Sequence, residues 1–264
     1  MWITPGRVFY GGLLGAPSLR RLGSWTLYFS RDAPLQLCID EDARWHEGWL
    51  AVVPPYRPHR LASAGRDVCD ILIEPETMDA ARLEDPLRAV LKDEGILDMA
   101  QPGVRGLVER LRAAHERLAS QLDPLPAADA AFDNFVFGTA LPEPPLDPRI
   151  LGVLEILKDN DALDRSAQEL ADQTQLSFHR FLHLFKDEVG VPLRTFRSWK
   201  RARSWLQHVT EDASLTAIAH RIGYPDSAHF SRSVRQVFGL QPKDVIAGCR
   251  RLALHLEPGR RSAR

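Results

Sequence analysis

The sequence predicts an α+β protein of several domains, with a β-rich N-terminal half and an all-α C-terminal half. Three observations support this fold class. Short β-type segments fill the first 75 residues, a proline-rich segment lies near the middle, and a helical unit occurs twice after it. The chain has 264 residues, of which 44% are hydrophobic and 26% are charged. This composition excludes wholesale disorder and collagen-like chains, and it provides enough apolar side chains for two cores.

The first 75 residues contain five short β-type segments, which are separated by clusters of Gly, Pro, Asp and Ser. The segments are residues 6–10, 25–29, 35–39, 49–53 and 68–73. This spacing is typical of a β-sandwich or a small barrel. So many short strands need a closed or doubled sheet, because open edges would otherwise be left to pair with other chains. We therefore expect a β domain over residues 1–95.

Residues 96–140 are expected to form a helical dimerisation segment. Apolar side chains are spaced 3, 4, 3 and 4 residues apart over 103–122, as in a coiled-coil seam. The seam consists of Val104, Leu107, Leu111, Ala114 and Leu118. It is too short for an independent coiled coil. It therefore packs on the barrel of its own chain, pairs with a second protomer in a homodimer, or does both.

The distribution of charge differs between the two halves. Residues 1–145 hold 15 basic and 21 acidic side chains, whereas residues 146–264 hold 19 basic and 14 acidic ones. This asymmetry indicates that the C-terminal half meets a polyanion. Between the halves, four prolines fall within residues 141–148, and proline cannot continue a helix or a central strand. We expect an extended linker at 141–146.

The sequence has neither a secretion signal nor a regular cysteine spacing, and this bears on the compartment of the protein and on the state of its thiols. The longest uncharged stretch near the start, residues 8–19, is too short to span a bilayer and lacks the basic segment of a secretion signal. We therefore expect a cytoplasmic protein that makes no membrane contact. Cys38, Cys69 and Cys249 are odd in number and widely spaced. They are expected to be reduced and mostly buried, without a disulfide or a zinc site.

A supersecondary unit is used twice in the second half of the chain. Phe181 and Gly190 match Phe230 and Gly239 at an offset of 49 residues, and each unit pairs a short apolar helix with a tight turn and a second helix. The helix boundaries carry capping residues: Asp147 before Pro148, Ser166 with Glu169, Ser177, and Asp226. The pattern predicts two helix-turn-helix units over 147–250, joined by one long helix from 192 to 209.

This second half resembles the AraC (arabinose-regulator) family of transcription factors. The resemblance is carried by residues 223–242, GYPDSAHFSRSVRQVFGLQP, and by residues 176–186, LSFHRFLHLFK. It covers 147–250 strongly, whereas residues 1–140 fit the family's cupin-like sensor domain more loosely. Val234 stands where the family usually has an aromatic residue, and the second motif ends in 244–248 without the family's tyrosine-arginine pair. The resemblance implies a sequence-specific transcriptional regulator of promoter DNA that responds to a small molecule. Exposed residues of the first helical unit are candidates for contact with RNA polymerase, but the sequence assigns none of them to it.

A recognition helix reads base edges with the outward side chains of its first turns. The family's base-reading positions map onto His179, Leu182, His183, Ser227, Ala228 and Arg232. Arg232 is the best candidate for a bidentate contact with guanine. The expected phosphate contacts are Arg180, His229, Arg235, Arg197 and Arg201, although His229 alternatively packs at the start of its helix. The two recognition helices should lie about 34 Å apart, one turn of the duplex.

The proline-containing turn at 54–61 resembles the strand connection of cupin-type sensor domains, with a histidine at the start of the next strand. Candidate effector-binding residues combine aromatic and basic character, which suits an aromatic or anionic effector. They are Arg7, Trp25, His46, Tyr56 and His59. A metal-binding cupin would offer two closely spaced histidines, and this sequence has no H-x-H. We therefore expect no metal and no cofactor.

Two other functions stay open. One is a metal-dependent cupin-type enzyme with an appended DNA-binding domain, which would need ligands such as His46, Glu47 and His59. The sequence lacks the common catalytic signatures, so we expect no enzyme. The other is a constitutive dimeric DNA-binding protein without an effector. Residues 251–264 form a basic tail, which is expected to be disordered and to bind polyanions without specificity.

Overall fold

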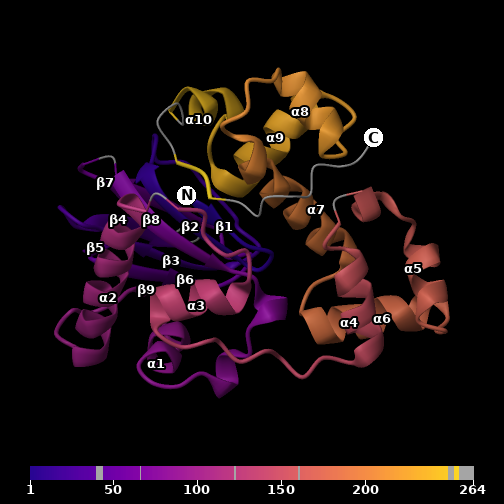
Figure 1. Cartoon of the computed structure of the whole chain (residues 1–264), viewed down its shortest axis with the longest axis horizontal. Helices are drawn as coiled ribbons and strands as arrows, with labels where there is room; N and C mark the ends of the chain where they lie inside the picture. Colours follow the sequence, from indigo (N-terminus) through magenta and orange to yellow (C-terminus); the bar gives the residue numbers. More distant parts are fainter. Residues whose placement is uncertain (40–43, 66, 122, 160, 249–252, 256–264) are drawn as a thin grey trace.

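The computed structural model describes residues 1–39, 44–65, 67–121, 123–159, 161–248 and 253–255. A β domain and a helical domain lie beside one another, with one helix running between them (Figure 1). The α+β fold class is therefore confirmed. Cys249 and most of the predicted basic tail lie outside the described residues. Within the described residues, no helix is long and apolar enough to cross a membrane.

The strands of the β domain pair into two antiparallel sheets. The larger sheet has the order β1-β2-β8-β3-β6-β9 and the smaller one β5-β4-β7. Their bounds are β1 Trp2–Ile3, β2 Arg7–Leu13, β3 Trp25–Phe29, β4 Leu35–Ile39, β5 His46–Gly48, β6 Leu50–Val53, β7 His59–Ser63, β8 Asp67–Ile73 and β9 Gly95–Ile96. All five predicted segments are strands. The two sheets share a core between them, but closure into a cupin-like barrel stays a prediction.

Alternation of side chains along the strands gives the larger sheet two different faces. In β3, Leu27 and Phe29 belong to one apolar core, whereas Tyr28 between them belongs to the core shared with the smaller sheet. This is the period of two that the backbone of a strand imposes. The first of these faces is covered by helices α1 (Leu87–Lys92), α2 (Pro102–Ala119) and α3 (Asp129–Phe137).

The predicted dimerisation seam lies inside the chain's own core. Its five side chains, at 104, 107, 111, 114 and 118, are each at most 7% exposed and pack on the sheet with Phe9 and Leu27. The sheet face needs an apolar cover, and the stripe of α2 supplies it. The dimerisation role assigned to Val104, Leu107, Leu111, Ala114 and Leu118 is therefore corrected: these side chains have no surface left for a second protomer.

The C-terminal domain contains two helix-turn-helix units. Its helices are α4 Pro148–Ile156, α5 Ala167–Gln173, α6 Phe178–Val189, α7 Leu193–Ser204, α8 Leu215–Arg221, α9 Ser227–Phe238 and α10 Pro242–Gly248. Short 3₁₀ turns occur at Pro75–Thr77, Ala80–Arg82, Asp161–Asp164 and Trp205–His208. The predicted joining helix of 192–209 is thus an α-helix only to residue 204, and a 3₁₀ turn continues it.

Local capping chemistry sets several helix ends as the sequence predicts, whereas Ser177 precedes α6 without a capping hydrogen bond from its side chain. Ser166 and Glu169 form a capping box, in which the Ser166 Oγ accepts from the Glu169 N–H at 3.1 Å and the Glu169 carboxylate accepts from the Ser166 N–H at 2.6 Å. The Asp226 carboxylate accepts from the His229 N–H at 2.7 Å. Gly190 and Gly239 end α6 and α9 with φ of 82° and 70°, a left-handed conformation that glycine adopts without strain.

The two helix-turn-helix units are anchored differently. The core of the first unit is built only from residues of the C-terminal domain, from α4 to the start of α7. The core of the second unit includes Met1, Val8 and Leu72 from the β domain, together with Trp199 and Phe230 from the helices. The second unit and the β domain therefore share one continuous apolar core.

Candidate nucleic-acid interface and inter-domain cavity

Helix α6 is amphipathic, and its exposed face carries the predicted base-reading residues of the first unit. Phe181 and Phe185 are fully buried, one helical turn apart, and hold the helix on the core. His179, Arg180 and His183 are exposed, and Leu182 is half-buried at the edge of the core. The buried stripe thus turns two imidazoles and one guanidinium outward on the first two turns of the helix, which provides hydrogen-bond donors for base edges and phosphates.

Helix α9 repeats this arrangement in the second unit. Phe230 and Val234 are fully buried, and Val234 occupies the position where the family usually has an aromatic ring. Ala228, Arg232 and Arg235 are exposed. Ser227, at the first helical position, is half-buried. Arg232 lies one helical turn after Ala228, on the same exposed face of α9. A side chain that reads the major groove needs such a position near the start of its helix.

The position of His229 is compatible with both roles considered from the sequence, a phosphate contact and packing at the start of α9. Its side chain is exposed, so it could reach a phosphate. Its ring also packs edge-on against the Tyr224 ring, with 5.5 Å between the ring centroids. Tyr224 in turn packs on Phe230 at 5.5 Å, so the start of α9 has an aromatic support. A phosphate contact of His229 stays a prediction.

Two cations of α7 that were predicted to bind phosphate are engaged within the chain. The Arg201 Nη2 lies 2.6 Å from the Asp164 Oδ1, and the Arg197 Nη2 donates to the Arg165 carbonyl at 2.6 Å. Both arginines are half-buried. A phosphate would have to compete with these partners, so Arg197 and Arg201 stay predictions with weaker geometric support than Arg232.

Two further cations of α7, Lys200 and Arg203, contact the β domain, and no motif in the sequence predicts this. Glu74, at the end of β8, is fully buried and accepts from the Trp199 Nε1 and the Lys200 Nζ, both at 2.8 Å. The Arg203 Nε lies 2.8 Å from the Glu74 Oε1, and Lys200 also pairs with Glu76 at 2.5 Å. Two carboxylates and two cations therefore join α7 to the sheet. We call Glu74, Glu76, Lys200 and Arg203 the inter-domain ion cluster.

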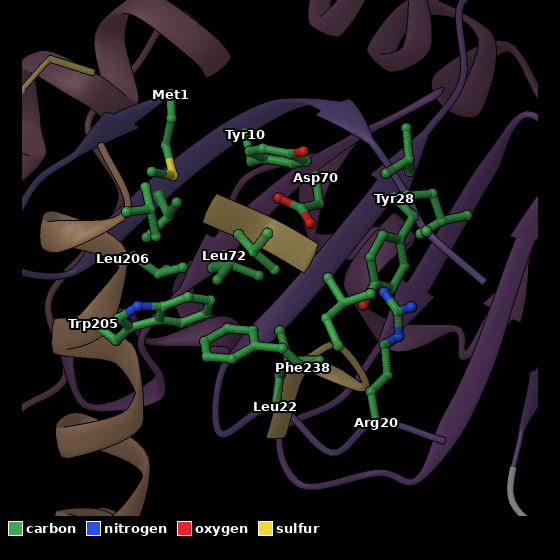
Figure 2. Close-up of a pocket in the computed structure, with 17 residues that line it drawn as sticks. Met1, Tyr10, Arg20, Leu22, Tyr28, Asp70, Leu72, Trp205, Leu206 and Phe238 are labelled. Carbon is green, nitrogen blue, oxygen red and sulfur yellow. The ribbon is translucent and has the colours of Figure 1, made fainter. Parts of the chain in front are cut away.

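A cavity of about 210 Å³ lies between the β domain and the second helix-turn-helix unit. Figure 2 shows Tyr10, Asp70 and Tyr28 on the side of the sheet, and Trp205 and Phe238 on the side of the helices. The pairing of β2 and β3 with β8 brings the three residues on the sheet together. Tyr10 on β2 and Tyr28 on β3 are the cross-strand partners of Asp70 on β8. The wall is mostly apolar. Its other lining residues are Met1, Val8, Leu14, Gly15, Arg20, Leu22, Val68, Leu72, Leu206, Val209, Leu240 and Val245.

The polar groups of the cavity gather at one end, around Arg20. The backbone of Arg20 exchanges hydrogen bonds with that of His59, at 2.9 and 3.1 Å. The His59 Nε2 lies 2.9 Å from the Tyr28 hydroxyl. Burial lowers the pKa of His59 to about 3 and raises that of Tyr28, so both are neutral near pH 7. Burial likewise raises the pKa of Asp70 to about 7, against the opposing effect of Arg20.

The five residues predicted to bind an effector are not brought together, and none of them lines this cavity. Arg7 is buried in an ion pair with Asp133, with 2.7 Å between Nε and Oδ1. Trp25 packs on the core under the helices, and His46 is exposed on β5. Tyr56 packs on the core that the two domains share. His59 approaches the cavity through its hydrogen bond with Tyr28, and Tyr56 through its backbone hydrogen bond to the lining residue Leu22.

Comparison with known proteins agrees with the geometry of the C-terminal domain. A family model described as "Helix-turn-helix domain" matches residues 170–247. The transcriptional activator RhaS of Citrobacter koseri is 32% identical over 105 residues, and RhaS of Escherichia coli is 33% identical over 99 residues. Residues 170–247 are thus a helix-turn-helix domain that is similar to the corresponding part of these transcriptional activators. The match to the first RhaS covers 39% of this chain and 37% of that protein, so it concerns the C-terminal helices and not the β domain.

Solved structures extend the likeness to the whole fold. ToxT of Vibrio cholerae, in the apo form of a variant, superposes with a TM-score of 0.61 over 94% of this chain and 99% of that chain, at 10% identity. Another ToxT structure, with unsaturated fatty acid bound, gives a TM-score of 0.50 over 92% and 95%, also at 10% identity. At such identities the likeness concerns the fold. The likeness to ToxT therefore includes both the β domain and the C-terminal helical domain of this chain.

Proposed function

We propose that the protein is a sequence-specific DNA-binding transcription regulator whose DNA binding responds to a small-molecule effector. The observation that carries the DNA-binding part is the pair of amphipathic recognition helices, α6 and α9, each with a buried apolar stripe and an exposed donor face. Six base-reading positions are proposed on these faces: His179, Leu182, His183, Ser227, Ala228 and Arg232. Arg180, His229 and Arg235 are proposed to bind phosphate.

The proposed binding mode places both units on one face of the duplex. The rigid α7 joins them, so the two recognition helices would enter successive major-groove segments about 34 Å apart. The operator should then contain two short blocks separated by about one turn of DNA. Selection of bound fragments from a random duplex library by the full chain is expected to enrich such a motif. Retention that depends on salt but not on sequence would contradict the proposal.

Replacement of Arg232 by alanine tests the assignment of a base-reading residue. We expect the affinity for the selected operator to fall by about 5- to 150-fold, since a bidentate guanine contact contributes about 1–3 kcal/mol. The measurement is an equilibrium titration of labelled operator and of a scrambled duplex. Arg235→Ala is the matched control, because loss of a phosphate contact weakens both duplexes alike and lowers the salt dependence. If Arg232→Ala behaves like Arg235→Ala, Arg232 reads no base.

The effector part of the proposal is supported by the cavity. A ligand there would contact residues of both domains, and a ligand can shift DNA binding only if it prefers one arrangement of the domains over another. ToxT, whose fold is similar, has been solved with unsaturated fatty acid bound. Homodimerisation and contact with RNA polymerase stay predictions, and a dimer would have to use a surface other than the buried stripe of α2.

A further inference from the structure

Arg20 is an unusual residue in the wall of the inter-domain cavity, because it is charged, buried and incompletely paired. The side chain is only 5% exposed, yet its Nε and Nη2 have no hydrogen-bond partner among the described residues. Buried polar groups in folded proteins almost always have partners, and an unpaired buried charge is costly. The backbone of Arg20 is held in place by two hydrogen bonds with that of His59.

The two unpaired donors of Arg20 form one edge of the guanidinium, which is the geometry that receives a carboxylate in bidentate fashion. Two other arginines of the chain, Arg7 and Arg149, bind a carboxylate through this edge. The Arg7 Nε and Nη2 donate to the two carboxylate oxygens of Asp133, at 2.7 and 3.1 Å. The Arg149 Nε and Nη2 donate to the two oxygens of Asp147, at 3.0 and 2.7 Å. At Arg20 this edge has no carboxylate partner.

The rest of the cavity suits an apolar body. Figure 2 shows Arg20 and Tyr28 at one end and Trp205 and Leu206 at the other, with Phe238 between them. An engineered apolar cavity of about 150 Å³ binds benzene. A cavity of about 210 Å³ therefore has room for a body of about eight carbon atoms.

We propose that the cavity binds an apolar monocarboxylate, with its carboxylate on the Nε and Nη2 edge of Arg20 and its hydrocarbon body between the sheet and the second helix-turn-helix unit. The inference deepens the proposed function, on which it rests, by assigning the effector a site and a chemical class. The ligand would touch Tyr28 and Arg20 in the β domain, and Trp205 and Phe238 in the C-terminal domain.

Calorimetric titration of the full chain with sodium octanoate tests this site. Octanoate is expected to bind about 10- to 100-fold more tightly than octanamide, because a hydrogen bond to a charged group contributes about 1.5–3 kcal/mol. Arg20→Lys keeps the charge but loses the planar edge, so it should bind octanoate more weakly. Arg20→Met should bind octanoate no better than octanamide. Arg21→Met is the matched control, since Arg21 is exposed and bonds to Val237 through its backbone.

A second variant tests the apolar part of the site independently of Arg20. Leu206→Trp adds volume to the helical wall, and octanoate should then bind more weakly although Arg20 is intact. Equal binding of octanoate and octanamide by the wild-type chain, or unchanged octanoate binding by Arg20→Met, would overturn the inference. The Arg20 variants should still bind the operator that Arg232→Ala loses. A failure of the ligand site is thus distinguishable from a failure of the DNA-binding function.

Asp70 makes the expected affinity depend on pH. Its Oδ1 has no hydrogen-bond partner, and burial raises its pKa to about 7. Ionised Asp70 would repel the ligand carboxylate, so octanoate should bind more tightly at pH 6 than at pH 8. Nearby ionisable groups are Arg20, Tyr10, Tyr28 and the amino terminus of Met1, and the lining residues of the helices carry none. Asp70→Asn should abolish the pH dependence, and its persistence in that variant would refute the role of Asp70.

Discussion

Replacement of Glu74 by alanine is expected to destabilise the full chain by about 3–5 kcal/mol, the usual cost of removing one partner from a buried charge pair. The change leaves Lys200 paired with Glu76 alone, and it removes the carboxylate that pairs with Arg203. It also removes the acceptor of the Trp199 indole. Urea unfolding, followed by tryptophan fluorescence, measures the loss as a lower midpoint. Trp199 makes the fluorescence directly sensitive to this interface.

The same variant should also loosen the joint between the two domains. Small-angle scattering is expected to show a larger radius of gyration, and limited proteolysis a faster cut in the linker at 141–146. Glu143→Ala is the matched control, because Glu143 is an exposed glutamate in that linker and only its backbone carbonyl makes a hydrogen bond, with Arg82. An unchanged urea midpoint in Glu74→Ala would contradict a stabilising role of the inter-domain ion cluster.

Removal of the Asp133 carboxylate should have an effect of similar size within the β domain. Asp133 receives two hydrogen bonds from Arg7 and one from the Leu141 N–H at 3.1 Å, and both side chains of the ion pair are at most 2% exposed. Asp133→Ala leaves the Arg7 guanidinium buried without its carboxylate partner, so we expect a loss of about 3–5 kcal/mol in the free energy of unfolding. The measurement is the urea midpoint of the full chain.

An exposed ion pair provides the matched control for Asp133. Glu155 and Lys158 pair on the surface of the first unit, and Glu155→Ala should change the free energy of unfolding by less than about 1 kcal/mol. The double variant Arg7→Met, Asp133→Leu should recover much of the lost stability, because it removes both buried charges. If the double variant is as unstable as Asp133→Ala, packing and not the stranded charge explains the loss.

The sequence predicts well those features that local chemistry determines. Ser166, Asp226 and Gly239 mark helix ends because a cap or a left-handed residue acts within one turn, and the structure confirms each of them. The β-type segment at 25–29 is likewise predicted, and it forms β3. These predictions need no knowledge of distant parts of the chain, so a single sequence is sufficient for them.

The sequence does not predict which partner a correctly identified face will meet. The stripe of α2 is apolar whether it covers its own sheet or a second protomer, and only the fold shows that Leu107 and Leu111 lie in the chain's own core. The same limit applies to α7. Lys200 belongs to α7, but its partner Glu74 lies 126 residues earlier, and no local pattern connects the two.

The cavity depends on register, which is a non-local property. Tyr10, Asp70 and Tyr28 lie side by side only because β2 and β3 pair with β8 at particular residues. A shift of one residue would turn each of these side chains to the opposite face of the sheet. Sequence reasoning therefore chose conspicuous aromatic and basic residues such as Trp25 and His46, which the fold places elsewhere.

The apolar core that the second unit shares with the β domain has a consequence for synthesis of the protein. Domains generally fold as units while the chain is made, with the N-terminal one first. Met1, Val8 and Leu72 reach their strands early, but Trp205 and Phe230, which cover them, are made more than 130 residues after Leu72. The newborn β domain therefore carries an uncovered apolar face until the last helices arrive. During that interval it is a natural client for chaperones, and a ribosome that stalls in the linker would release an aggregation-prone fragment.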